Sequence, residues 1–407
     1  MKDNNAQYLL AKVMGWQDSE AVQERVPTLQ LLADYKYDQY QRYGPGKRFI
    51  ENLALWLNQF NPDDREAALN FVEKRMIFIS DSELSHLVQL AYPDVIAQET
   101  IRLVAEENGI PTYRVGEITS HPRFRQLQLK SLYLGLSDGA RTNELRRGSN
   151  HDISNEQIWQ AYELGEAKAE DMLAELRSVL SGDPSAQNHV ASNEEVWKAY
   201  ESGSKENANS LLDDLRASLS ATKKPSLDAK FNLIWLLDDF SGSGNTYIRF
   251  DSKSGKFKGK IKKIYERLHQ GDLIDPSHYE VFLLLYVATR QAIDHIEYWS
   301  ERFTSEMGYK PLQVRVLFPI EPNIAVNIDT DPDLIAIIEN QKYYDDRASD
   351  KHIAVGGTKD ARMGFAGCAL PVVLSHNTPN NSLYLLWGPE TFNFFGLFPR
   401  ASRHREF

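Results

Sequence analysis

Short, continuously apolar runs separated by polar stretches recur from the middle of the chain onward. Five of them have the length of a buried strand: residues 131–136, 231–237, 281–288, 312–318 and 370–374. Between some of these runs, residues 260–268 and 291–305 place apolar side chains at helical spacing. Strands that alternate with helices predict an α/β fold with a mostly parallel sheet.

The first 112 residues follow a different pattern, in which apolar positions recur at helical spacing. The predicted helices are residues 33–43, 49–60, 65–74 and 99–108. Asn61 and Pro62 supply a start signal for the third helix, and Gly109 stops the fourth. Residues 75–80 fit either a strand or the buried end of a helix. We therefore expect an N-terminal helical region over residues 1–112.

An internal repeat interrupts the α/β pattern. Residues 154–165 read SNEQIWQAYELG and residues 192–203 read SNEEVWKAYESG, so that eight of twelve positions are identical. Each copy is predicted to form a capped amphipathic helix, a glycine turn and a second helix. The expected division is therefore an α/β domain of residues 113–150 and 223–407, interrupted by a duplicated helical insertion at 151–222.

Composition places the chain among globular proteins, with 42% hydrophobic and 25% charged residues. The longest strongly apolar run, at 281–288, is far shorter than the ~20 residues that span a bilayer. The chain has one cysteine and opens on polar residues, so we expect a cytoplasmic protein with no membrane partner.

The net charge of −11 is unevenly distributed. Residues 151–220 contain 5 basic and 14 acidic residues, whereas residues 251–270 contain 7 basic and 2 acidic ones. The net negative charge therefore comes largely from the repeats. The basic run around 253–263 fits either a solvated helix start or a contact to nucleic-acid phosphates.

The most informative stretch is residues 231–248, FNLIWLLDDFSGSGNTYI. An apolar strand ends in Asp238 and Asp239, and a small polar loop follows: Ser241, Gly242, Ser243, Gly244, Asn245 and Thr246. Carboxylates at the end of a strand can accept hydrogen bonds from the vicinal hydroxyls of a ribose. Glycines let backbone N–H groups approach a phosphate, to which the hydroxyls also donate. The pattern predicts a sugar-phosphate site.

This stretch resembles the phosphoribosyl-pyrophosphate (PRPP) signature of type I phosphoribosyltransferases. A wider pattern over roughly residues 135–400 resembles the phosphoribosyltransferase-like family of bacterial conflict systems, which includes effectors encoded beside retron reverse transcriptases. The resemblance implies a type I phosphoribosyltransferase-like sheet, in which Asp238 and Asp239 are catalytic and residues 241–246 hold the phosphate. It also implies Mg²⁺ bound together with PRPP.

Two further loops are candidates for the same site. In the resembling fold, a loop after an earlier strand holds pyrophosphate, and here Asp138, Gly139 and Arg141 occupy that place in chain order. After the run at 370–374 come His376, Asn377, Asn380 and Asn381. These side chains could read the edge of a base or acceptor, or they could simply cap the backbone of a proline-containing loop.

The expected function is a phosphoribosyltransferase-like antiphage effector that binds PRPP or a nucleotide and transfers or cleaves a ribosyl-5-phosphate bond. The resemblance adds gating by a partner complex. Two alternatives stay open: a PRPP- or nucleotide-sensing module without turnover, and a scaffold that docks a reverse transcriptase and its RNA or DNA. Self-association also stays open.

Overall fold

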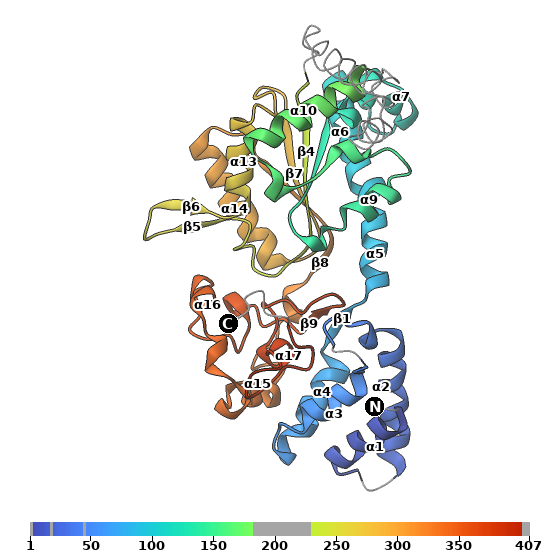
Figure 1. Ribbon diagram of the computed structural model, residues 1–407, viewed down its shortest axis with the longest axis vertical. Helices are drawn as coiled ribbons and strands as arrows, with labels where there is room; N and C mark the ends of the chain where they lie inside the picture. Colours follow the sequence, from blue (N-terminus) through green and yellow to red (C-terminus); the bar gives the residue numbers. More distant parts are fainter. Residues whose placement is uncertain (1–2, 17–18, 44–45, 182–228, 401–407) are drawn as a thin grey trace, which may run out of the picture.

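The computed structural model describes residues 3–16, 19–43, 46–181 and 229–400. Its centre is a five-stranded, fully parallel sheet in the order β3-β2-β4-β7-β8 (Figure 1). The strands are β2 (Ser131–Gly135), β3 (Ile158–Gln160), β4 (Leu233–Ser241), β7 (Glu280–Thr289) and β8 (Leu312–Ile320). The predicted α/β class with a mostly parallel sheet is confirmed.

Helices cover both faces of this sheet, because β4 and β7 are apolar at nearly every position and bury both sides. One face packs on α10 (Glu166–Ser181), α13 (Lys260–Gln270) and α14 (Arg290–Met307). The other face packs on α5 (Asp81–Leu90), α6 (Ala97–Asn108), α8 (Pro122–Leu129) and α9 (Thr142–Gly148). On that second face the rings of Trp235 and Phe282 stack with centroids 4.3 Å apart.

The N-terminal helices form a second lobe with the C-terminal part of the chain (Figure 1). This lobe contains α1 (Asp3–Met14), α2 (Ser19–Tyr35), α3 (Phe49–Leu57), α4 (Arg65–Lys74), α15 (Pro332–Glu339), α16 (Lys351–Val355) and α17 (Tyr384–Trp387). A two-stranded parallel sheet of β1 (Ile77–Ile79) and β9 (Val372–Leu374) ties the two parts of the chain together. The N-terminal helical region is confirmed. Most buried apolar side chains of residues 326–398 share its core, whereas Cys368, Leu370, Val372 and Leu374 pack with the sheet lobe.

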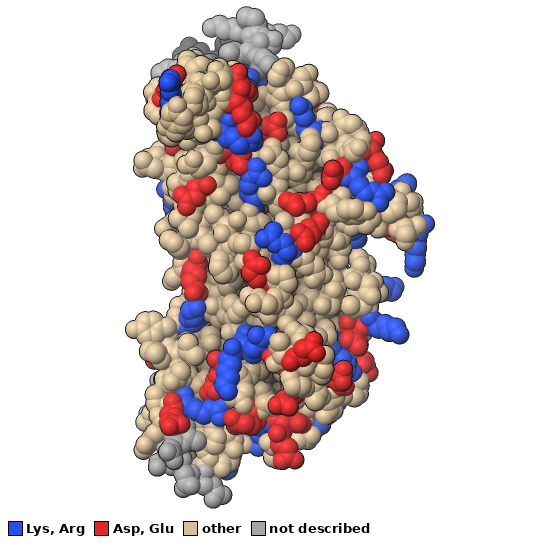
Figure 2. Space-filling view, turned by 180° about the vertical axis from the view of Figure 1, so that it is seen from behind, with Lys and Arg blue, Asp and Glu red and all other residues tan. Residues whose placement is uncertain are grey.

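The remaining elements are short. They are α7 (Val115–Thr119) and the antiparallel hairpin of β5 (Arg249–Asp251) and β6 (Lys256–Lys258). The hairpin projects from the body of the molecule (Figure 1) and carries part of the basic run that the sequence showed. Figure 2 shows basic side chains at the edge where it projects, whereas charges of both signs are mixed over the rest of that face.

The prediction for the first repeat copy is wrong at its first helix. Residues 154–165 form short 3₁₀ turns and the edge strand β3, whose Ile158 pairs with Tyr133 of β2. The side chain of Gln157 donates hydrogen bonds to the carbonyl oxygens of Gln128, at 2.6 Å, and Ser131, at 3.0 Å. The sheet edge therefore overrides the helical periodicity. The second copy lies outside the described residues.

A second difference concerns the predicted helix at 33–43. Helix α2 ends at Tyr35, and residues 37–39 form a single 3₁₀ turn. The carboxylate of Asp38 in this turn accepts a hydrogen bond of 2.7 Å from the backbone N–H of Phe49, at the start of α3. The aromatic periodicity of 33–43 therefore reflects packing of Tyr37 and Tyr40 in the core and not one continuous helix.

Candidate functional site

Asp238 and Asp239 lie near the end of β4, beyond the point where its neighbour stops. The ladder between β2 and β4 ends with the pair of Gly135 and Leu237, whereas Asp238 still pairs with Leu285 of β7. The edge of β4 that faces β2 is thus open at the acid pair. This is the carboxyl end of a parallel sheet, where open α/β folds bind their ligands.

The carboxylate of Asp238 is 3% exposed and has three side-chain donors. The hydroxyl of Tyr247 donates at 2.8 Å and the ammonium of Lys260 lies 3.0 Å away, while Ser137 Oγ donates to the other oxygen. Burial raises the pKa of Asp238 above its ordinary value. The charge of Lys260 opposes this shift and the neighbouring Asp239 adds to it.

Asp239 has a different environment, because its Oδ2 lies 2.8 Å from Nε2 of His376. Burial acts to raise the pKa of Asp239, but the hydrogen bond and the charge of His376 outweigh it and lower that pKa below its ordinary value. The pKa values of two adjacent acids are therefore pushed apart, and Asp239 is the member that stays ionised.

The glycine loop after β4 is held from two sides. Thr289, which caps α14, donates its hydroxyl to the carbonyl oxygen of Gly242 at 2.6 Å. On the other side, a Cβ atom on Gly242 would lie 2.5 Å from Cγ of Asn381. Gly244 adopts a φ of +76°, in the left-handed region. The loop therefore requires glycine at both positions.

The loop after β2 meets the acid pair directly. Ser137 Oγ bonds to Asp238 and accepts a hydrogen bond of 3.2 Å from the backbone N–H of Gly139. A Cβ atom on Gly139 would overlap the carboxylate of Asp239. The structure thus brings Asp138 and Gly139 to the cavity that contains the acid pair.

Arg141, which the sequence placed in the same loop, does not line this cavity. Its guanidinium forms ion pairs with Asp81 and Glu144 and donates to Ser85 Oγ at 3.1 Å. These partners direct Arg141 toward α5. A phosphate contact would require Arg141 to leave these partners.

A third wall comes from the lobe formed by the two ends of the described chain. His376 and Asn377 follow β9, and Asn380 and Asn381 come next in the same loop. Asn381 is fixed because its amide donates to the carbonyl oxygen of Phe365 at 3.2 Å. The buried Nδ1 of His376 has no hydrogen-bond partner among the described residues.

Together the three walls enclose a cavity of about 790 Å³, a size that accommodates a small ligand. Of the predicted site residues, Asn245 and Arg141 are outside its lining. Those that line it are Asp138, Gly139, Asp238, Asp239, Ser241, Gly242, Ser243, Gly244, Thr246, His376, Asn377, Asn380 and Asn381.

The sequence did not single out several side chains that the fold brings to this cavity. They are Arg42, Tyr162, Tyr247, Lys260, His352 and Arg400, whereas Ser137 belongs to the loop of residues 137–141 that the sequence did predict at the site. Lys260 is the first residue of α13 and also donates to the carbonyl oxygen of Leu136 at 3.0 Å, so it joins the acid pair to the loop after β2. The only sequence signal for Lys260 was its place in the basic run around residues 253–263, which does not distinguish it from the neighbouring lysines.

Comparison with protein families matches residues 53–400 to PRTase-CE, a phosphoribosyltransferase-like family. The match covers most of the chain. The chain belongs to the PRTase-CE family. No curated protein and no solved structure matched the chain. The PRTase-CE match contains the acid pair, the glycine loop and the loops after β2 and β9, whereas Arg42 lies outside it.

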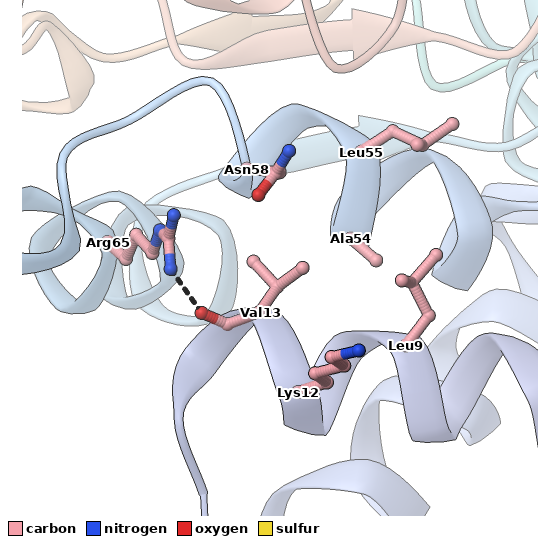
Figure 3. A pocket seen from close by; sticks show the side chains of 7 residues that line it. All are labelled: Leu9, Lys12, Val13, Ala54, Leu55, Asn58 and Arg65. Carbon is pink, nitrogen blue, oxygen red and sulfur yellow. Dashed lines mark hydrogen bonds between the residues drawn. The ribbon is translucent and has the colours of Figure 1, made fainter.

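A second, smaller pocket of about 280 Å³ lies among the N-terminal helices, far from the acid pair in the chain (Figure 3). It is lined by Leu9, Lys12, Val13, Ala54, Leu55, Asn58 and Arg65. The guanidinium of Arg65 donates to the carbonyl oxygen of Val13 and so joins α4 to α1. Apart from this internal bond, its lining is mainly aliphatic. Leu9, Lys12 and Val13 precede the PRTase-CE match, whereas the other four lining residues fall within it.

Two further observations concern the described part of the chain. Its helices include none that is both long and apolar enough to cross a membrane. Within the same residues, His, Cys, Asp and Glu side chains form no group of three or more arranged to hold a metal ion.

Proposed function

We propose that this chain binds Mg-PRPP, or a nucleotide of similar shape, and transfers or cleaves the bond at C1′ of a ribosyl 5-phosphate. The observation that carries the proposal is the meeting of the acid pair, the glycine loop and the Ser137–Gly139 loop in one cavity. Membership of a phosphoribosyltransferase-like family supports it.

Each wall has a role in this proposal. Asp239, kept ionised by His376, accepts hydrogen bonds from the ribose hydroxyls, and Asp238 supports it from the buried side. Ser243, Gly244 and Thr246 hold the 5-phosphate through backbone and hydroxyl donors. The nucleophile attacks C1′ as pyrophosphate leaves, and fixed charges stabilise the oxocarbenium-like transition state.

In this proposal the loop after β2 would hold the leaving group together with its magnesium ion. Magnesium prefers oxygen ligands, and in this proposal the phosphate oxygens of PRPP and water would supply most of them, while Asp138 and Asp239 line the same cavity. Because Arg141 is engaged elsewhere, Lys260 is the cation placed to contact the departing pyrophosphate.

The direct test is calorimetric titration with Mg-PRPP of the wild type and of the Asp238→Ala/Asp239→Ala double variant. We expect micromolar binding by the wild type and no detectable binding by the double variant, with the wild-type signal reduced when EDTA replaces magnesium. Equal binding by both proteins would remove the acid pair from the site. Absence of binding by the wild type would contradict the proposal itself.

Lys260 gives a second test. Replacing it by Ala removes the cation nearest to Asp238, and we expect Mg-PRPP to bind at least tenfold more weakly, because charge-assisted contacts contribute about 1.5–3 kcal/mol. Lys263→Ala is the matched control, since Lys263 is exposed on the same helix and does not line the cavity. Equal losses in the two variants would mean that only overall charge matters.

The finer role as an antiphage effector, gated by a partner complex, rests on resemblance alone. Its test is a phage challenge of bacteria that express the complete native locus, with or without the acid-pair substitution. Protection that requires the acid pair supports an effector. Protection that persists after the acid pair is replaced favours a scaffold. Protection that requires the acid pair, in a protein that releases no pyrophosphate from PRPP, favours a sensor.

A further inference from the structure

Each carboxylate of the acid pair has a basic side chain beside it. Lys260 lies 3.0 Å from Asp238 Oδ2, and His376 Nε2 lies 2.8 Å from Asp239 Oδ2. Among the other lining residues, Asp138 is acidic and Arg42 and Arg400 are basic. The charges of the remaining lining residues then decide which second ligand the cavity favours.

Two of those remaining residues are arginines on the wall contributed by the helical lobe. Arg42 and Arg400 both line the cavity, and the positive charges of both lie close enough to Tyr40 to favour its ionised form, although burial raises the pKa of Tyr40 to about 12. Tyr40 itself is fixed, because its hydroxyl donates to the carbonyl oxygens of Phe398 and Pro399. The two guanidinium groups therefore belong to one local region.

The guanidinium of Arg42 is held by a backbone carbonyl group and forms no ion pair with a carboxylate among the described residues. Its Nε donates to the carbonyl oxygen of His376 at 3.1 Å, which fixes the group beside the loop that carries His376 and Asn377. Its two Nη groups have no hydrogen-bond or ion-pair partner among residues 3–16, 19–43, 46–181 and 229–400. A planar pair of donors in this arrangement suits a carboxylate or a phosphate.

The location of this region separates it from the phosphate loop. The glycine loop and the loop after β2 belong to the sheet lobe, whereas Arg42 and Arg400 belong to the opposite lobe, on the same side as His376. Arg42 also lies outside the residues that match the family, so this feature is not part of what the match assigns. Arg42 and the acid pair therefore belong to different walls of one cavity.

We propose that the second ligand of the cavity, the acceptor, is an anion whose carboxylate or phosphate group is bound by Arg42 with help from Arg400. This inference rests on the proposed function, because the second ligand is an acceptor only if that reaction takes place. The anion site itself does not depend on the reaction. An anionic group on Arg42 would place the rest of the acceptor beside the His376 loop, between that loop and the acid pair.

The test uses pairs of probes that differ in one charge. Orotate is compared with uracil and nicotinate with nicotinamide for a carboxylate, and phenyl phosphate with phenol for a phosphate. Each is titrated calorimetrically into the wild type, with and without saturating Mg-PRPP. At least one anion is expected to bind roughly tenfold or more tightly than its neutral partner, and which pair does so identifies the anionic group.

Arg42→Gln should reduce that preference to about twofold or less while Mg-PRPP binding stays within about twofold of the wild type. The control is Arg114→Gln, which removes the same charge from an exposed residue that pairs with Glu117 outside the cavity. It should retain the full preference. Loss of the preference in both variants would show a general charge effect and overturn the inference.

The outcomes also separate the two proposals. Normal Mg-PRPP binding with no discrimination between anionic and neutral probes overturns the anionic acceptor and leaves the proposed function standing. Discrimination that depends on Arg42, without any binding of Mg-PRPP, overturns the proposed function and establishes the anion site in its own right. Failure of both measurements rejects both proposals.

Discussion

Replacing Asp239 by Asn is expected to reduce pyrophosphate release from Mg-PRPP by roughly 10²–10³-fold, with a much smaller loss of ligand binding. The carboxylate of Asp239 is the ionised member of the pair and lies 2.8 Å from His376. Asn has nearly the same shape, so the ribose still fits. The negative charge that stabilises a developing oxocarbenium ion is lost, and this loss acts mainly on the transition state.

The measurement is the rate of pyrophosphate release with water as the acceptor, and again with a mixture of common nucleobases and their carboxylates. Asp251→Asn is the matched control, because Asp251 pairs with Lys258 on the β5–β6 hairpin and does not line the cavity. That variant should release pyrophosphate at the wild-type rate. Wild-type release by Asp239→Asn would show that Asp239 has no part in the chemistry.

Replacing Gly242 by Ala should have the second largest effect, a loss of Mg-PRPP binding of roughly a hundredfold. The added Cβ would lie 2.5 Å from Cγ of Asn381, which is held by Phe365 and cannot easily retreat. The glycine loop must then move away from the His376 loop. A displacement of about 1 Å at a positioning group is enough to cost about 10²-fold.

The same substitution should lower the free energy of unfolding by about 1–3 kcal/mol, the usual range for overpacking. Gly116→Ala is the control, since a Cβ there meets no atom within 4 Å. Urea unfolding followed by circular dichroism separates the two effects, because binding is measured far below the unfolding midpoint. Unchanged binding by Gly242→Ala would mean that the loop and Asn381 move apart freely.

The sequence predicted best those parts of the site and the fold whose residues are adjacent in the chain. One continuous segment contains β4, its two carboxylates and the loop that follows. The apolar run of β7 has the length of a buried strand. The period of residues 154–165 was misleading, because Ile158, Ala161 and Tyr162 have the i, i+3, i+4 spacing of a helix face, although residues 158–160 form an edge strand. Only the available edge of β2 decides between them.

The rest of the site depends on contacts between residues that are far apart in the chain. Nothing near Lys260 shows that its ammonium meets Asp238, and nothing near Arg42 shows that it reaches the His376 carbonyl, 334 positions away. The direction of Arg141 is likewise set by Asp81, on another helix. These partners are chosen by the packing of the two lobes and by the pairing of β1 with β9, which no local pattern encodes.

The shared core of the two ends of the described chain has a consequence for how the protein is made. The hydroxyl of Tyr40 bonds to the carbonyl oxygen of Phe398, 358 positions later, and Trp56 donates to Leu385 in the same way. While the ribosome is still extending the chain, the N-terminal helices lack their packing partners and the cavity lacks the wall that carries His376. Contacts of such long sequence separation form slowly. A nascent chain is therefore expected to emerge without a finished binding site and to acquire one only after residues 376–400 have left the exit tunnel.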